Sequence, residues 1–180
     1  QWQSEGIALL DFENRTGRCA QGTPEMNDTV RAKVPDGTVV RGLHFRVGVP
    51  DDRNHLFAAS SPPPLNLSAM FWSWSEGYIF MRLDYYSMGA AKAFPIHMGG
   101  DSTQVDVTIP EFNPSVDMVV VDLAALLKNA ANACMGGFKS VGCKPMWDSV
   151  ASSSAVISDA VSFFRRGVGR STASTSTGAH

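Results

Sequence analysis

The sequence predicts a mainly β protein: an antiparallel β-sandwich or a partly open barrel, with long loops and one or two short helices. Short apolar or alternating segments recur along the chain, and clusters of Gly, Pro, Asn and Asp separate them. The 180 residues suit one domain with a substantial core. We expect that domain to span residues 1–169 and the Ser/Thr-rich segment 170–180 to be disordered.

The first third of the chain is expected to supply a buried strand and a hairpin. Residues 6–12 form a short apolar run that is typical of a buried strand. Residues 29–34 and 39–49 alternate with the period of a strand, and the Pro-Asp-Gly-Thr turn at 35–38 predicts that they pair. The second of these strands carries one apolar face: Leu43, Phe45, Val47 and Val49.

The rest of the chain is expected to alternate between loops and further strands. The irregular stretch 50–65 has the length of a functional loop, and residues 66–74 fit a short helix or a strand. Asp122 is expected to cap a helix over 123–129, because its carboxylate can accept from the free N–H groups of the first turn. Further elements are expected as strands at 78–86, 93–97, 103–109 and 118–121, and as a helix at 158–163.

Charge and motif content exclude several classes of protein. The net charge is −2. Because the chain has no excess of basic residues, its charge does not indicate a nucleic-acid partner. No apolar run reaches transmembrane length, and the first residues do not resemble a signal peptide. The P-loop, G-x-G-x-x-G, H-E-x-x-H, C-x-x-C and G-x-S-x-G motifs are absent. The nucleotide-binding, zincin, redox and α/β-hydrolase classes therefore lose their best evidence.

The cysteines indicate one disulfide. Cys134 and Cys143 flank a short Gly-rich stretch, which suits a disulfide in an oxidising compartment. Cys19 is left over, either as a free thiol or with a partner outside this chain.

Two of the four histidines are candidates for metal ligands. His180 ends the tail, and His44 lies on the polar face of its predicted strand. His55 lies in the long loop, and His97 ends a strand just before two glycines, which allow close approach of the backbone. The second unusual feature is the Trp72-Ser73-Trp74 run, whose rings share one face in a strand and diverge in a helix.

Two blocks of the sequence resemble a known family. The first is GLHFRVGVP at 42–50, followed by Asn-His at 54–55. The second is PLNLSAMFWSW at 64–74, followed by GYIFMRLD at 77–84. Together they resemble the signature of the MbnP/CorA/MopE proteins, which are copper-linked secreted or surface proteins of methanotrophs and other bacteria. The resemblance spans most of residues 6–145, and the Trp-Ser-Trp block is specific.

The resemblance implies a mononuclear copper site formed by two histidines and by kynurenine, an oxidation product of tryptophan. Carried over to this sequence, the histidines are His55 and His97. The modified residue is Trp72 or Trp74, and the sequence does not decide between them. We expect a low-coordinate site of neutral nitrogen donors to favour Cu(I), and a neighbour such as Asn54 or Asp51 to orient His55.

The resemblance also implies a role and a location. The role is copper acquisition and not catalysis, so we expect that the protein is not an enzyme. The location is the cell surface, the outer membrane or the periplasm. A haem-containing partner would oxidise the tryptophan. Many relatives carry a cysteine soon after the position of His97; here Met98-Gly99-Gly100-Asp101-Ser102 follows, consistent with an unpaired Cys19.

Two other functions remain open at the level of sequence. One is a carbohydrate- or peptide-binding β-sandwich that uses the face formed by Trp72 and Trp74. The other is a copper protein that cycles between oxidation states, as a redox enzyme or an electron carrier. We rank copper acquisition first.

Overall fold

Strands make up most of the regular structure, as the sequence predicts. The computed structural model describes residues 2–20, 22–86, 94–100, 104–128, 134–136, 142–151 and 163–168. The strands are β1 (Gln3–Ser4), β2 (Ile7–Ala8), β3 (Gly42–Val47), β4 (Phe71–Ser73), β5 (Gly77–Tyr85), β6 (Phe94–Gly99), β7 (Val105–Pro110), β8 (Asp117–Val121), β9 (Cys134–Gly136) and β10 (Phe164–Val168). The helices are α1 (Asp51–Asn54), α2 (Leu123–Leu127) and α3 (Lys144–Ala151), with 3-10 helices η1 (Ala58–Ser60) and η2 (Ser68–Met70). None of these helices is long and apolar enough to cross a membrane.

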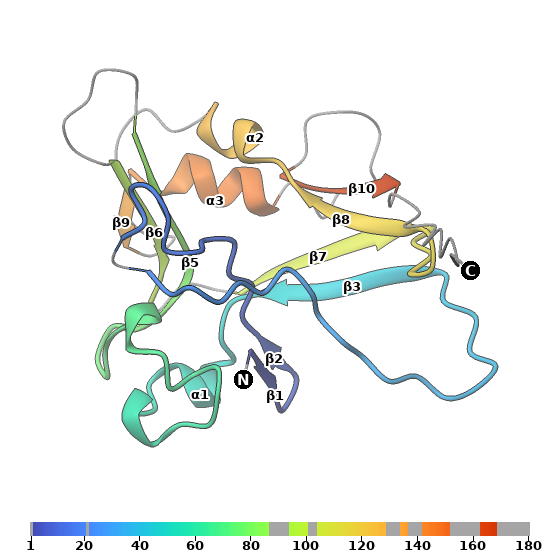
Figure 1. The fold of residues 1–180 in the computed structure, drawn as a ribbon, viewed down its shortest axis with the longest axis horizontal. Helices are drawn as coiled ribbons and strands as arrows, with labels where there is room; N and C mark the ends of the chain where they lie inside the picture. Colours follow the sequence, from blue (N-terminus) through green and yellow to red (C-terminus); the bar gives the residue numbers. More distant parts are fainter. Residues whose placement is uncertain are drawn as a thin grey trace, which may run out of the picture.

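The described strands pair in two-stranded ladders and one larger sheet. β1 pairs with β2, β3 with β7, and β8 with β10, each antiparallel. β4, β5, β6 and β9 form a four-stranded sheet in this order, in which β9 runs parallel to β6. Figure 1 shows the β3–β7 and β8–β10 ladders on one side of the molecule and the larger sheet on the other. The architecture is a mainly β sandwich, and the strands of the described segments form no closed barrel.

The core lies where these strands meet α3. Ile96 from β6, Ile109 from β7 and Trp147 from α3 are all buried in one cluster. Aromatic contacts join the elements around it: Phe45 of β3 meets Phe164 of β10 with ring centroids 5.1 Å apart, edge to face. Alternation explains which residues face inward, because successive side chains of a strand point to opposite sides.

Most of the predicted elements are confirmed. β5, β6, β7 and β8 lie within a few residues of the predicted strands, and the apolar residues of β3 pack against the core. Asp122 caps α2 by accepting hydrogen bonds from the backbone N–H groups of Ala124 and Ala125. Segment 66–74 contains both predicted alternatives, since η2 leads directly into β4. The predicted helix at 158–163 and the predicted tail fall on residues that are almost all outside the described part of the chain.

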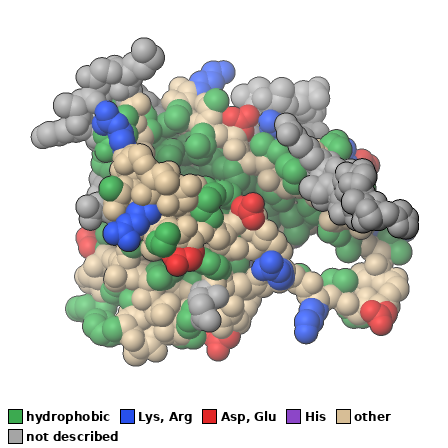
Figure 2. Space-filling model, viewed as in Figure 1, with side chains coloured by type: hydrophobic (Ala, Val, Ile, Leu, Met, Phe, Trp, Pro, Cys, Tyr) green, Lys and Arg blue, Asp and Glu red, His purple; other side chains and the backbone are tan. Residues whose placement is uncertain are grey.

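The predicted hairpin is wrong, although its turn forms. The N–H of Thr38 donates to the carbonyl of Pro35 at 3.1 Å, but residues 29–34 form no strand and β3 pairs with β7 instead. Figure 2 shows part of the chain standing away from the body at the lower right, and Figure 1 identifies it as the segment between β2 and β3. Its valines are exposed, whereas β7 offers β3 a second apolar face over the core. Burial of apolar area therefore selects the partner that is distant in sequence.

The predicted strand at 6–12 is also mostly wrong. Only Ile7 and Ala8 are in a strand, and Leu10 and Phe12 are exposed. An isolated bridge between Asp11 and Asn27 is the next pairing along the chain. Several observed elements were not expected from the sequence, and α3 and β10 are the longest of them.

The predicted disulfide is present. Cys134 and Cys143 are bonded and almost fully buried, and Cys19 is a free, exposed thiol. The disulfide joins β9, which flanks β6, to the residue that precedes α3. It therefore fastens the edge of the sheet that carries His97 to the core helix.

Candidate metal centre

The four predicted ligand residues lie on three neighbouring parts of the fold. His55 directly follows α1, Trp72 is in β4, Trp74 begins the turn from β4 to β5, and His97 is in β6. β4 and β6 flank β5 on either side, so the larger sheet carries both Trp72 and His97.

The ring of His55 is held by the β4–β5 turn. Its Nδ1 lies 2.7 Å from the carbonyl oxygen of Trp74. A carbonyl oxygen only accepts, so Nδ1 carries the proton and donates it. In the neutral ring Nε2 then holds the lone pair that could bind a metal.

Asn54 anchors the segment that carries His55. Its side chain is 3% exposed. Its amide nitrogen donates to the carbonyl of Gly100 at 2.8 Å, and its amide oxygen accepts from the N–H of Tyr78 at 2.9 Å. Both of its polar atoms therefore bind backbone groups at the ends of β5 and β6. It fixes where His55 begins, and the carbonyl of Trp74 fixes the ring.

A glycine makes room for this anchor. Gly77, the first residue of β5, has φ +83°, and a Cβ there would lie 2.6 Å from the amide nitrogen of Asn54. Both the left-handed backbone and the close contact require glycine at this position.

His97 projects away from the core between two buried neighbours. Ile96 and Met98 are fully buried in the main cluster, and strand alternation turns His97 to the opposite face. Its Nε2 lies 2.8 Å from Oδ1 of Asp84 on β5, and its side chain is 13% exposed. A carboxylate only accepts, so Nε2 donates and Nδ1 holds the lone pair in the neutral ring.

A second group holds the Asp84 carboxylate. Nε of Arg82 donates to Oδ2 of Asp84 at 3.3 Å, and Nη1 of the same guanidinium donates to the carbonyl of Ala69 at 3.2 Å. Ala69 belongs to η2, which leads into β4. Hydrogen bonds thus connect His97 to the segment that precedes Trp72. Arg82 and Asp84 lie in the GYIFMRLD block at 77–84, but the sequence assigned no role to either; the register of β5 against β6 brings them to His97.

The two tryptophans have different surroundings. The ring of Phe71 packs on Tyr78 with centroids 4.8 Å apart, so Trp72 projects to the other side of β4. There its Cζ3 lies 3.3 Å from the position of a Cβ on Gly100, and the side chain is partly buried. Trp74 lies beyond the end of β4 and is 71% exposed. Trp72 is thus the partly buried ring of the pair, and Trp74 is the exposed one.

Two observations relate the predicted ligands to one another. A hydrogen bond joins the ring of His55 to the carbonyl of Trp74, and the ring of Trp72 lies 3.3 Å from where a Cβ on Gly100 would be, three residues after His97. No hydrogen bond links His55 to His97 within the described segments. Nor do the described residues contain a group of three or more His, Cys, Asp or Glu that could hold a metal. The predicted site would not form such a group, because only two of its three ligands are His, Cys, Asp or Glu and the third derives from tryptophan.

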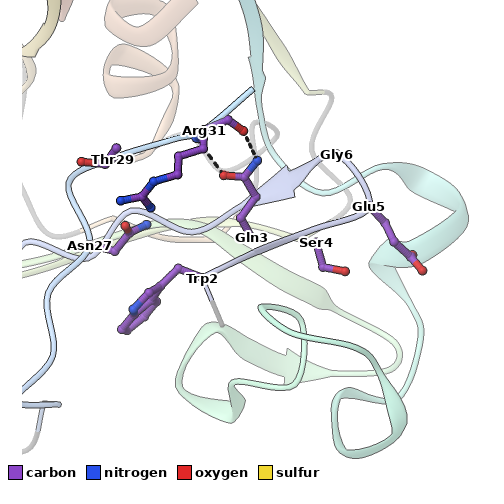
Figure 3. Close-up of a pocket in the computed structure, with 8 residues that line it drawn as sticks. All are labelled: Trp2, Gln3, Ser4, Glu5, Gly6, Asn27, Thr29 and Arg31. Carbon is purple, nitrogen blue, oxygen red and sulfur yellow. Dashed lines mark hydrogen bonds between the residues drawn. The ribbon is translucent and has the colours of Figure 1, made fainter. Parts of the chain in front are cut away.

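A concave region elsewhere on the molecule contains none of the predicted ligands. Figure 3 shows this pocket of about 400 Å³ between the β1–β2 turn and the segment that follows Asp11. Gln3 crosses it and bonds to both backbone groups of Arg31. The other lining residues are Trp2, Ser4, Glu5, Gly6, Asn27 and Thr29.

Comparison with known proteins gives one family and one fold. A family model described as MbnP matches residues 1–139, which include all four predicted ligands. Among solved structures, the MbnP from Methylosinus trichosporium matches with a TM-score of 0.69 and 21% sequence identity, over 93% of this chain and 77% of that chain. No curated protein matches this sequence.

Proposed function

Because the chain belongs to the copper-associated MbnP family, we propose that it is an exported Cu(I)-binding protein that serves copper acquisition and is not an enzyme. The proposed ligands are His55, His97 and a tryptophan-derived kynurenine. The observation that carries the proposal is shared by the two histidines. Each donates one ring N–H to an oxygen of the protein, the carbonyl of Trp74 or the carboxylate of Asp84. Metal-bound histidines almost always have such a partner, which fixes the tautomer and the ring orientation.

The chemistry of the donor set fits copper. The lone pairs of His55 and His97 are on Nε2 and Nδ1, and neutral imidazole nitrogens are good copper ligands. An indole N–H only donates, so an intact tryptophan offers copper no nitrogen lone pair. Kynurenine carries an aromatic amine instead and supplies a third nitrogen donor when it forms. Its formation needs dioxygen or an equivalent oxidant, which cleaves the C2–C3 bond of the indole and adds two oxygen atoms; hydrolysis then releases the C2 carbon as formate and leaves the amine. We propose that a haem-containing maturation partner catalyses the oxidation.

We assign the modification to Trp72. Its ring lies against Gly100, at the end of the strand that carries His97, and it is partly buried. Trp74 contributes its backbone carbonyl to His55, while its own ring faces solvent. The third ligand must lie close to both histidines, and the position of Trp72 meets this requirement better than that of Trp74.

The disulfide supports export. Cys134 and Cys143 are bonded and buried, and disulfides persist in oxidising compartments such as the periplasm and the cell surface. Where the protein resides among these compartments would follow from cell fractionation of its host.

The test combines mass spectrometry with copper stoichiometry. In protein from the native host, the peptide that contains Trp72 and Trp74 should carry one kynurenine, at Trp72, and the protein should bind one copper ion. The variants His55→Ala and His97→Ala should each lose tight copper binding. His44→Ala is the matched control. Like His97, His44 lies in a strand and is bonded to a carboxylate, but it belongs to the β3–β7 ladder and not to the sheet that carries His97. The His44→Ala protein should bind copper as the wild type does. Tight binding that survives both His55→Ala and His97→Ala would refute the proposed site.

A further inference from the structure

We infer that Asp84, held by Arg82, positions His97 so that Nδ1 is the atom presented to the metal. This inference rests on the proposed function. It assigns a positioning role to two residues that touch no copper themselves, and it predicts which nitrogen of His97 is the donor.

The register of the sheet places the carboxylate where the ring can reach it. Arg82 lies directly opposite His97, and Asp84 lies opposite Pro95, two residues further along the same face. Long side chains at such diagonal positions of an antiparallel pair come within contact. The observed distance of 2.8 Å from Nε2 to Oδ1 is that of a charge-assisted hydrogen bond.

Arg82 restrains Asp84 from the other side. The guanidinium donates to Oδ2, so each carboxylate oxygen has its own partner. The same guanidinium is fixed by the carbonyl of Ala69 in η2. The carboxylate is therefore held from two sides, and a rotation that would release His97 would also break its hydrogen bond to Arg82.

A second group of one histidine, one arginine and one aspartate differs from the His97, Arg82 and Asp84 group in its exposure to water. On the β3–β7 ladder, Oδ1 of Asp106 lies 3.0 Å from Nε2 of His44 and 2.8 Å from Nε of Arg46. The His44 side chain is 56% exposed, whereas that of His97 is 13% exposed. Water competes for the exposed ring and much less for the shielded one. A hydrogen bond to a carboxylate should therefore restrict the orientation of His97 far more than that of His44.

The proposed device has a spectroscopic signature that does not depend on copper. The Nε2–H of His97 should exchange slowly with water and give an imidazole N–H resonance in the metal-free, ¹⁵N-labelled protein at neutral pH. Asp84→Ala should lose this resonance and bind Cu(I) roughly 10- to 100-fold more weakly, the range typical for loss of a partner behind a metal-bound histidine. Asp84→Asn keeps the size of the side chain and an acceptor oxygen but loses the charge. Its Cu(I) affinity should fall between those of the wild type and Asp84→Ala. If the alanine variant folds poorly, Asp84→Asn replaces it in the affinity measurement.

Asp106→Ala is the matched control and should keep both the His97 resonance and the copper affinity of the wild type. An Asp84→Ala protein that binds Cu(I) as tightly as the wild type, or that keeps the slowly exchanging resonance, would overturn the inference. Absence of copper binding in the wild type and in Asp106→Ala alike would instead overturn the proposed function. The His97 resonance would then decide alone whether Asp84 positions the ring.

Discussion

Replacing Asn54 by alanine tests whether the anchor beneath His55 is structural. The side chain is 3% exposed and makes two hydrogen bonds, to the carbonyl of Gly100 at 2.8 Å and from the N–H of Tyr78 at 2.9 Å. Alanine would leave both backbone groups without this partner in a buried place. Each such loss costs roughly 1–3 kcal/mol, so we expect Asn54→Ala to lower the free energy of unfolding by about 2–6 kcal/mol.

The assay is chemical denaturation of the metal-free protein, followed by fluorescence and circular dichroism. Asn66→Ala is the control, because Asn66 is exposed and lies in the loop before η2; a surface change of this kind is expected to shift stability by no more than about 0.5 kcal/mol. Asn54→Asp separates the two bonds. It keeps the acceptor for Tyr78 but sets a carboxylate oxygen against the carbonyl of Gly100, so it should not recover the stability of the wild type.

The same variant also bears on the metal centre. If Asn54 fixes where the His55 segment begins, Asn54→Ala should weaken Cu(I) binding even under conditions where the protein stays folded. The reasoning would be refuted by an Asn54→Ala protein whose free energy of unfolding and copper affinity both match those of Asn66→Ala. In that case the two hydrogen bonds would contribute nothing net, and something other than Asn54 would position the loop.

Three further changes have expected outcomes. Gly77→Ala should destabilise the protein more than Gly37→Ala in thermal or chemical unfolding: both glycines have φ near +80°, but only at Gly77 would the new Cβ meet another group, the amide of Asn54 at 2.6 Å. Reduction of the Cys134–Cys143 disulfide, or its replacement by two alanines, should cost about 2–3 kcal/mol by the loop-closure relation for a separation of 9 residues, measured as a shift in the denaturation midpoint. The hydrogen bond from Arg46 to Asp106, together with the charges of Arg46 and His44, holds the pKa of that carboxyl below its ordinary value of 3.8. Its contribution to stability should be complete above that value and disappear as the pH falls through the lowered pKa; a ¹³C-carboxyl titration should show the pKa rising toward 3.8 in Arg46→Gln.

The strands that could be predicted from sequence are those whose pattern and burial agree. β7 alternates cleanly, and its inward residues Val107 and Ile109 are fully buried. β5 is long and rich in β-branched and aromatic residues, and its predicted extent is close to the observed one. Segment 29–34 has a similar local pattern and a good turn after it, yet it remains solvated. Alternation indicates that a segment could be a strand, but only a partner with a complementary apolar face makes it one.

The candidate site could be predicted in its ligands but not in their supports. His55, His97 and the two tryptophans stand out because histidine and tryptophan are few in this chain. The supporting contacts join residues far apart in sequence, such as Asn54 with Gly100. They depend on the register of β5 against β6, which shifts at an irregularity between Ile79 and Met81. A shift of one residue in a strand moves every later side chain to the other face, and sequence patterns alone do not locate it.

The glycine pair after His97 shows how the register and the site depend on each other. The sequence indicated only that Gly99 and Gly100 permit close approach of the backbone. In the structure, a Cβ on Gly99 would lie 2.3 Å from the carbonyl oxygen of Tyr78, and one on Gly100 would lie 3.0 Å from that of Glu76 and 3.3 Å from the ring of Trp72. Contacts below 3.0 Å cannot be relieved when the neighbour is backbone, so any side chain at position 99 would force β5 and β6 apart. That separation would disturb the pairing that sets Asp84 beside His97, and a side chain at position 100 would move the ring of Trp72. The two glycines therefore act on both halves of the proposed centre without being ligands.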